Sequence, residues 1–291
     1  MLIGVKIKYL QSVGTIFCYN TLFMKYKKIQ FHADDFGRSK EISNNIIKCI
    51  KFGFLDGVSV MINHDDGSHK ILKKLKGVSI RLHLNLTEFP KSENNKNLSF
   101  LKLIFLNNIQ KKKAIKEINS QINKFIKVYK PKELKIDGHE HIHMIPWISE
   151  YLLKQKIFNI KELRNANEKL MLPRLIDLIN FNYLRNFLAC IILKILSFFK
   201  KTDLNSPQFA GLLYSGMQNK HTIKKSLNFF KNNNYNNCEI LVHPGYSSLK
   251  EKSKFGEKYF KFYNSINRKK EYNLCFLKEI KKELLNFKKG K

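Results

Sequence analysis

The chain of 291 residues has few acidic side chains: 23 Asp and Glu stand against 54 Lys and Arg, for a formal net charge of +31. This imbalance points to nucleic acid or an anionic membrane as partners. The lysines are, however, spread along the whole chain, basic clusters such as 111–113 and 268–270 are short, and no zinc-finger or RNP-type pattern accompanies them. We therefore expect no specific nucleic-acid partner, and interpret polyanion binding as a salt-sensitive side effect.

Paired cysteines are also lacking. The five cysteines are odd in number, lie far apart and form no CxxC motif, which argues against a disulfide framework and against a thiolate metal site. Each is interpreted as a small buried hydrophobic residue in a reducing compartment, so we expect a cytoplasmic location. The cysteines are Cys18, Cys49, Cys190, Cys238 and Cys275.

No apolar run is long enough to be a clear membrane span, which needs about 20 residues. The most apolar stretch, 187–199, is interrupted by Lys194. It predicts a buried or interfacial helix, and it leaves a peripheral membrane contact open. The N-terminal stretch before Met24 has polar residues where a signal peptide needs an apolar region, and no cleavage site is visible. Residues 1–27 are interpreted as an N-terminal extension, with a signal peptide as the minor alternative.

The chain has no internal repeat and no Pro/Gly/Ser-rich linker, so residues 28–291 are expected to form a single domain. Short apolar runs alternate with helical patterns, which is typical of βα units and a largely parallel sheet. About seven strands are expected, in an α/β fold that is an irregular (β/α) barrel, similar to a TIM barrel. The expected strands are 28–32, 57–62, 78–87, 134–137, 160–164, 209–214 and 239–243.

Helical periodicity predicts helices between these strands. The first begins at Ser39 as its N-cap and stops at Gly53. One that follows 57–62 is expected to be capped by Asp65 or Asp66. The longest covers 109–130, one helix around 271–287 closes the chain, and 165–206 is interpreted as a helical excursion from the barrel.

Two adjacent carboxylates, Asp34 and Asp35, close the first apolar run and precede Gly37. Side chains alternate along a strand, so neighbouring aspartates cannot both follow the pattern of the ladder. We expect the pair at a strand end, where the chain turns and both carboxylates face one pocket. Two like charges this close repel each other unless a cation lies between them.

Histidines stand at or near the ends of other predicted strands. His83, His139 and His243 therefore join the two aspartates at the carboxyl ends of separate strands, the face on which β/α barrels build active sites. Two imidazoles and one carboxylate with open positions are typical of a catalytic divalent-metal site. The second aspartate would then act as general base on a water activated by the ion.

The run His139-Glu140-His141-Ile142-His143 contains HExxH, which forms a zinc site in metallopeptidases when it lies on a helix. Asp137-Gly138 before it and Pro146 after it disfavour a long helix. A peptidase using His139, Glu140 and His143 is therefore the less favoured alternative. An extended or turning segment would instead place the three histidines on one side.

Taken together, four blocks resemble the YdjC-like family of carbohydrate deacetylases, which includes relatives associated with hopanoid biosynthesis. Weaker similarity appears at 163–164 and 209–216, so the resemblance spans roughly residues 28 to 246. The four blocks, in family order, are HADDFG at 32–37, RLHLNLT at 81–87, DGHEHIH at 137–143 and EILVHPGY at 239–246.

By position, the resemblance assigns the metal ligands to Asp35, His83 and His139, the catalytic base to Asp34 and a general acid to His243. Substrate contacts are assigned to Asn85, His141, His143, Arg164 and Tyr246. The chain departs from the family pattern at His32, where asparagine is usual, and at Gly138, where serine or threonine is usual. Arg81 and Glu88 also stand where smaller residues are common, which is expected to alter the pocket rim.

The resemblance implies hydrolysis of the N-acetyl group of an amino sugar in an oligosaccharide or a glycolipid. One divalent ion is implied, Mg²⁺ by family resemblance, although two histidines and an aspartate suit Zn²⁺ or another transition ion at least as well. A homodimer is a further possible partner state. A basic, non-enzymatic module that binds nucleic acid or anionic lipid is the alternative that rests on charge alone.

Overall fold

The computed structural model describes residues 27–64, 67–88, 98–171, 173–199 and 206–290. The N-terminal extension predicted for 1–27 and the predicted caps Asp65 and Asp66 lie outside these residues, apart from residue 27. The strands are β1 Lys28–Phe36, β2 Gly57–Val60, β3 Ser79–Leu84, β4 Leu134–Gly138, β5 Ile160–Leu163, β6 Gln208–Ala210 and β7 Asn237–Val242. The helices are α1 Lys40–Phe52, α2 His69–Leu72, α3 Phe100–Ile104, α4 Asn108–Tyr129, α5 Pro146–Lys154, α6 Leu175–Leu178, α7 Phe181–Phe198, α8 Lys220–Asn232, α9 Glu257–Tyr263, α10 Ile266–Leu274 and α11 Lys278–Lys288, with 3₁₀ turns η1 His139–Met144 and η2 Leu249–Lys254.

All seven strands are parallel and form one sheet in the order β5-β4-β3-β2-β1-β7-β6. Read from β6 to β5, this order follows the sequence cyclically, as it does around a β/α barrel. The described strands β5 and β6 do not pair, so the barrel is open between them. The predicted irregular (β/α) barrel of about seven strands is confirmed.

The sequence determines several element boundaries in the expected way. The Ser39 side chain accepts a hydrogen bond from the Ile42 N–H at the start of α1, and the helix ends at Gly53. Asn107 and Gln110 form a reciprocal capping box at the start of α4. The apolar faces of these helices pack on the sheet, where they form the main core with buried strand residues such as Phe31, Ile136 and Ile240.

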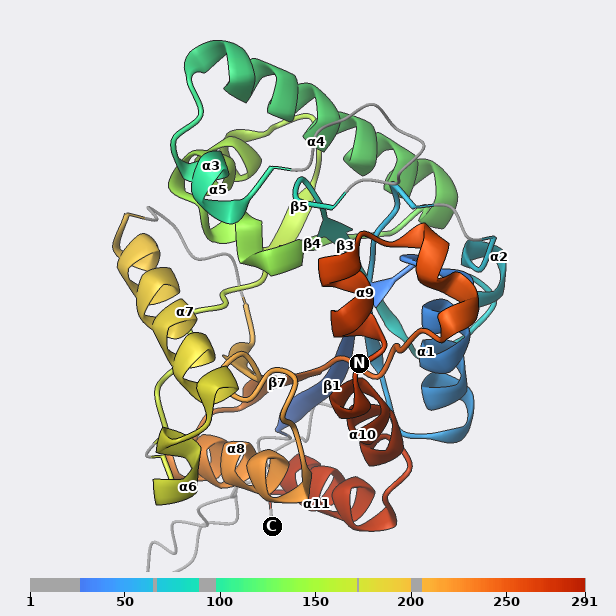
Figure 1. The fold of residues 1–291 in the computed structure, drawn as a ribbon, viewed down its shortest axis with the longest axis vertical. Helices are drawn as coiled ribbons and strands as arrows, with labels where there is room; N and C mark the ends of the chain where they lie inside the picture. Colours follow the sequence, from blue (N-terminus) through green and yellow to red (C-terminus); the bar gives the residue numbers. More distant parts are fainter. Residues whose placement is uncertain (1–26, 65–66, 89–97, 172, 200–205, 291) are drawn as a thin grey trace, which may run out of the picture.

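A second, smaller core lies where the barrel is open. α7 runs along one edge of the molecule (Figure 1), and its residues Tyr183, Cys190 and Leu193 pack with Phe209 and Leu241 from the β6 and β7 side. The predicted helical excursion is thus present as α6 and α7, and it closes the gap between β5 and β6. Cys49, Cys190, Cys238 and Cys275 are buried free thiols, as expected, and Cys18 lies outside the described residues.

The prediction of one helix over 271–287 is wrong. α10 ends at Leu274 and α11 begins at Lys278. The Cys275 carbonyl accepts a hydrogen bond from the backbone N–H of Phe54, at 3.2 Å, after the end of α1. In a continuous helix the Cys275 carbonyl would accept a hydrogen bond from an N–H of the next turn, but here it accepts one from a distant segment of the chain.

Candidate metal centre and active site

β1 continues through the aspartate pair but bends there. Asp35 has φ = 73°, and the register between β1 and β2 shifts between Ala33 and Phe36. A bulge of this kind re-aims side chains that would otherwise point to opposite faces. As predicted, both carboxylates face one cavity.

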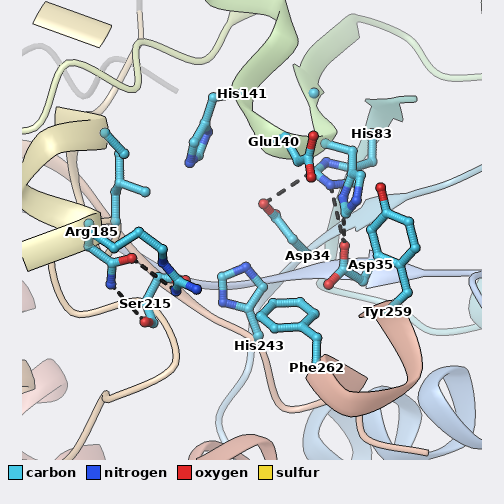
Figure 2. A pocket seen from close by; sticks show the side chains of 15 residues that line it. Asp34, Asp35, His83, Glu140, His141, Arg185, Ser215, His243, Tyr259 and Phe262 are labelled. Carbon is cyan, nitrogen blue, oxygen red and sulfur yellow. Dashed lines mark hydrogen bonds and ion pairs between the residues drawn. The ribbon is translucent and has the colours of Figure 1, made fainter. Parts of the chain in front are cut away.

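That cavity has a volume of about 490 Å³ and lies at the carboxyl ends of the parallel strands. Figure 2 shows Asp34, Asp35 and His83 close together, with Arg185 reaching in from α7 on the other side and His243 between them. The structure therefore brings together groups that are more than 200 residues apart in the sequence. The predicted site residues that line the cavity are Asp34, Asp35, His83, His139, His141 and His243.

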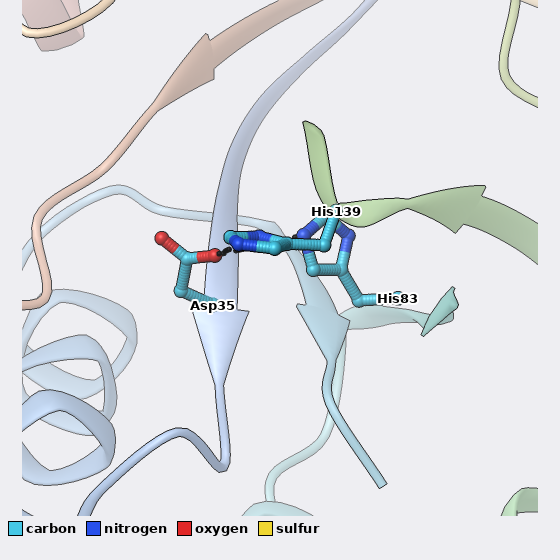
Figure 3. Close-up of side chains that lie close together, drawn as sticks. All are labelled: Asp35, His83 and His139. Atoms are coloured by element: carbon cyan, nitrogen blue, oxygen red, sulfur yellow. Dashed lines mark ion pairs between the residues drawn. The ribbon is translucent and has the colours of Figure 1, made fainter. Parts of the chain in front are cut away.

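Asp35, His83 and His139 present their ligand atoms to one another, all within 4.8 Å (Figure 3). Asp35 Oδ1 lies 3.2 Å from His139 Nδ1 and 3.6 Å from His83 Nε2. Ligand atoms of a tetrahedral ion with bonds of about 2.0–2.2 Å lie roughly 3.3 Å apart. The spacing and the donor set therefore fit a divalent metal ion.

Carboxylates behind the two imidazoles orient them. His83 Nδ1 lies 2.6 Å from Asp137 Oδ1, which leaves Nε2 directed toward Asp35. On His139, Nδ1 faces Asp35 and Nε2 lies 3.5 Å from Glu88 Oε2. Metal-binding histidines usually hold a carboxylate or carbonyl through their second nitrogen, which fixes the ring and strengthens the ligand.

The electrostatics of the cluster favour a cation. Burial lowers the pKa of His83, but the charges of Asp34 and Asp137 outweigh burial and raise the pKa to about 9. Burial likewise opposes protonation of His139, yet hydrogen bonds to Asp35 and Glu88 raise its pKa to about 10. The same negative potential would attract a divalent ion in place of the two protons.

Two buried arginines keep the aspartates ionised. Arg164 binds Asp34 through two hydrogen bonds of 2.8 and 3.0 Å, and Arg268 binds Asp35 Oδ2 at 2.9 Å. Burial raises the pKa of each carboxyl group, but the adjacent guanidinium group holds it well below its usual range. Arg268 leaves Oδ1 of Asp35 facing the histidines.

A second group of possible ligands, His32, Asp34 and Asp137, lies next to the first. Its two carboxylates already share Arg164, whose Nη2 lies 2.9 Å from Asp137 Oδ2. His32 Nε2 is 2.6 Å from the Ser59 hydroxyl, which donates to Asp137. The guanidinium group thus supplies the positive charge here, so this group supports the site rather than forming a second ion site.

His243 stands apart from the metal cluster and is held by Glu271. The backbone N–H of His243 donates to Glu271 Oε2 at 2.6 Å, and its Nδ1 lies 3.8 Å from the same oxygen. The imidazole faces the cavity, with 13% of the side chain exposed. The side chain thus stands in the cavity outside the ligand cluster, where a group that gives a proton to a leaving group would have to lie.

Residues 28–285 match the family described as YdjC-like protein. The chain belongs to the YdjC-like family.

Among similar proteins, the carbohydrate deacetylase of Danio rerio is 26% identical over 84% of this chain and 90% of its own length. The carbohydrate deacetylase of Clostridium beijerinckii is 25% identical over 90% of this chain and 99% of its own. The chitooligosaccharide deacetylase of Enterobacter sp. strain 638 is 25% identical, over 42% of this chain and 52% of its own.

One solved structure has the same fold. A protein from Enterococcus faecalis V583, provisionally described as a cellobiose-phosphate cleavage protein, superposes with a TM-score of 0.65. The match covers 90% of this chain and 95% of that one at 18% sequence identity. At this identity the similarity concerns the fold alone.

Four residues that the YdjC-like resemblance assigns to substrate are not among the described residues that line the cavity. Asn85 is buried, and its side-chain oxygen accepts from the N–H groups of Thr87 and Glu88. His143 is buried and its Nε2 lies 2.9 Å from the Arg164 carbonyl oxygen. Tyr246 packs edge-on against Tyr272. The fourth, Arg164, donates hydrogen bonds to Asp34. Of the five residues predicted to contact substrate, His141 lines the cavity.

The HExxH run does not form the helix that a metallopeptidase needs. It follows β4 as the short η1 turn, in which Glu140 and His141 have φ values of 51° and 57°. His139 faces Asp35, whereas His143 faces the backbone at Arg164. The segment therefore delivers one histidine to the metal cluster, which agrees with the sequence argument against a helix.

Sequence reasoning missed several supporting residues. Asp137 closes the expected strand 134–137, and a carboxylate at a strand end is the same signal that indicated Asp34 and Asp35. No local pattern indicated Glu88, Glu271 or Arg268. The expectation that Arg81 and Glu88 alter the pocket rim is wrong, because both side chains are buried: Glu88 lies behind His139, and Arg81 pairs with Glu162 and Glu239.

Proposed function

We propose that this protein is a metal-dependent carbohydrate deacetylase that hydrolyses the N-acetyl group of an amino sugar in an oligosaccharide or a glycolipid. Membership of the YdjC-like family and relatives named as carbohydrate and chitooligosaccharide deacetylases support it. The observation that carries the proposal is the convergence of Asp35, His83 and His139 with Asp34 and His243 in one cavity.

Asp35, His83 and His139 would hold the ion. When bound, a divalent ion polarises a carbonyl oxygen and lowers the pKa of a water molecule. The donor set of two imidazoles and one carboxylate suits Zn²⁺ or another transition ion at least as well as Mg²⁺. Titrating the metal-free protein with Zn²⁺ and with Mg²⁺ distinguishes the two.

The residues of the chain itself would handle the protons. Asp34, kept ionised by Arg164, accepts a proton from the attacking water. His243, held by Glu271, gives a proton to the departing amine. Acetate and a free amino sugar result, with one water consumed.

The test is an acetate-release screen over N-acetylated saccharides, soluble and lipid-linked, with metal analysis of the purified protein. We expect acetate from at least one N-acetylhexosamine substrate, and loss of release after chelation. Folded, metal-loaded protein that releases no acetate from any of them would contradict the proposal.

Glu140→Gln separates deacetylation from the HExxH alternative. A peptidase would use Glu140 as its base and should lose activity. In a deacetylase, Glu140 is an exposed residue at the cavity edge that takes no proton, so turnover should change by less than about threefold. Proteolysis that vanishes in this variant would favour the peptidase instead.

A further inference from the structure

The two faces of α7 differ in what covers them. One face packs on the second core through Tyr183, Cys190 and Leu193. On the same face, the Asn186 side-chain amide donates to the carbonyls of Leu213 and Ser215, at 3.3 and 2.9 Å. This face is fixed to the protein by apolar packing and by hydrogen bonds.

The opposite face is apolar and exposed. Its members recur every three or four residues, so they form one stripe along the helix. Leu188 is 60% exposed and Ile195 is 51% exposed. We define the outer face of α7 as Phe181, Leu184, Leu188, Ile192, Ile195 and Phe198, all exposed large hydrophobic residues. A continuous apolar stripe of this kind usually marks an interaction surface.

A basic residue borders this face. At 100° per residue, Lys194 falls at one edge of the stripe. Arg185 falls at the other edge, but its guanidinium group donates to Asn186 Oδ1, at 3.2 Å, and lines the cavity. Between Leu178 and Cys238 the only acidic residue in the sequence is Asp203. An apolar stripe bordered by Lys194, on a helix without acidic residues in a chain of net charge +31, is complementary to a surface that is apolar inside and anionic outside.

We propose that the outer face of α7 docks on an anionic membrane, with the helix lying in the plane of the interface. Its apolar side chains enter the acyl boundary, and Lys194 at the edge of the stripe reaches the phosphates of the headgroups. The proposal does not depend on the deacetylase activity.

Two other arrangements fit the structure less well. Phe181–Phe198 is long and apolar enough to cross a membrane by length and composition. Crossing would, however, remove Asn186 and the buried face from the second core. A second copy on the outer face would bring together two chains of charge +31, and like charges of this size oppose association.

Docking would also set the position of the cavity relative to the membrane. Asn186 and Ala189 of α7 line its wall, together with Arg185. The wall of the cavity and the membrane contact are thus two sides of one helix, so the cavity lies beside the headgroups.

The test is flotation of the full-length protein with vesicles of phosphatidylcholine alone or with about one third phosphatidylglycerol. We expect binding to the anionic vesicles. The double variant Leu188→Glu/Ile195→Glu should weaken that binding at least about tenfold, because it puts two charges on the face that enters the lipid. Neither residue lines the cavity.

The matched control is Phe52→Glu/Ile71→Glu, which makes the same charge change at exposed apolar residues of α1 and α2, on the opposite edge of the molecule (Figure 1). It should bind like the wild type. Equal loss in both double variants, or no loss in either, would overturn the proposal. So would a wild-type dimer that ignores vesicles and that Leu188→Glu/Ile195→Glu converts to a monomer.

A fluorescence measurement gives a second test if the Glu variant does not fold. Leu188→Trp adds a fluorophore to the outer face, whereas the single natural tryptophan, Trp147, lies in α5. Lipids brominated on their acyl chains should quench the Leu188→Trp protein more than the wild type. Equal quenching of the two proteins would show that α7 does not enter the bilayer.

Discussion

At the scale of single residues, the proposed metal centre depends on three side chains, Asp35, His83 and His139, which lie together at the ends of three strands. Removing a residue that orients a metal ligand typically lowers metal affinity about 10–100-fold. Removing a ligand itself should lower metal affinity at least as much. We expect Asp35→Asn and His83→Ala to bind Zn²⁺ at least about 100-fold more weakly and to release no acetate. Calorimetric titration of the metal-free proteins measures the affinity.

The control for these variants is His221→Ala, which removes an exposed histidine from α8. It should bind metal and turn over like the wild type. Unchanged affinity in His83→Ala would place the ion elsewhere.

His243 allows proton transfer to be separated from metal binding. Because it lies outside the ligand cluster, His243→Ala should keep its metal affinity while kcat falls by roughly 10²–10⁴. Parallel metal titration and acetate-release kinetics check this. A parallel loss of metal would make His243 a ligand, and an unchanged kcat would exclude it as the acid.

The sequence allowed prediction of these reacting groups better than of their supports. Asp35, His83 and His139 were found because polar residues at the ends of apolar strands stand out against their neighbours. Arg164 and Arg268 pair with aspartates 130 and 233 residues away, and no local periodicity encodes such a pair. Glu88 was misplaced for the same reason: its burial depends on Arg38 and His139, which are distant in sequence.

At the scale of elements, one buried carboxylate holds a wall of the cavity. Glu168 Oε2 accepts hydrogen bonds from the N–H groups of Gly211, Leu212 and Leu213, at 2.7–3.1 Å. Leu212 lines the cavity. Burial raises the pKa of Glu168 to about 7, although the three N–H groups act in the opposite direction.

This raised pKa predicts a pH-dependent stability. Because the pKa in the folded state lies above the ordinary 4.5, the wild type loses unfolding free energy as pH rises from 4.5 to about 7. Glu168→Gln carries no charge and should lack this loss. Its unfolding free energy relative to the wild type should rise by about 2 kcal/mol between about pH 5 and pH 8. Denaturant unfolding with chelator present measures it, and a difference independent of pH would contradict the assignment.

Elements were predictable where their limits are set locally. Ser39 and Gly53 bound α1 because capping and helix termination depend on adjacent residues. The break between α10 and α11 was missed because it depends on the Cys275 carbonyl meeting Phe54. No glycine or proline marks that break in the sequence.

At the scale of the whole molecule, the net charge predicts weak and unspecific binding to DNA. Phosphate contacts release counterions, so affinity should fall by roughly 10³–10⁵ between about 50 and 200 mM salt and should be equal for unrelated sequences. Filter binding with two duplexes of different sequence checks this. Tight, sequence-dependent binding at the higher salt would instead support a nucleic-acid module.

The alternation of strands and helices was sufficient to predict the barrel, because parallel βα units wind in one direction. The position of its opening was not predictable, since pairing between β5 and β6 depends on the path of the intervening chain. The sequence indicated that this path is a helical excursion. That α7 covers the gap between β5 and β6, by packing in the second core, was visible only in three dimensions.

In this barrel a helix, α7, covers the gap that a strand pair would otherwise close. The spacing across this gap is therefore not fixed by hydrogen bonds between strands. Hydrogen-bonded ladders fix the spacing of β1, β3, β4 and β7, and with it the geometry of the reacting groups. The described residues of the connection after Arg164, up to β6, have no such ladder, so this part can change in length without shifting Asp35, His83 or His139. A change in its length would therefore reshape the α7 wall of the cavity and leave the ligand cluster in place.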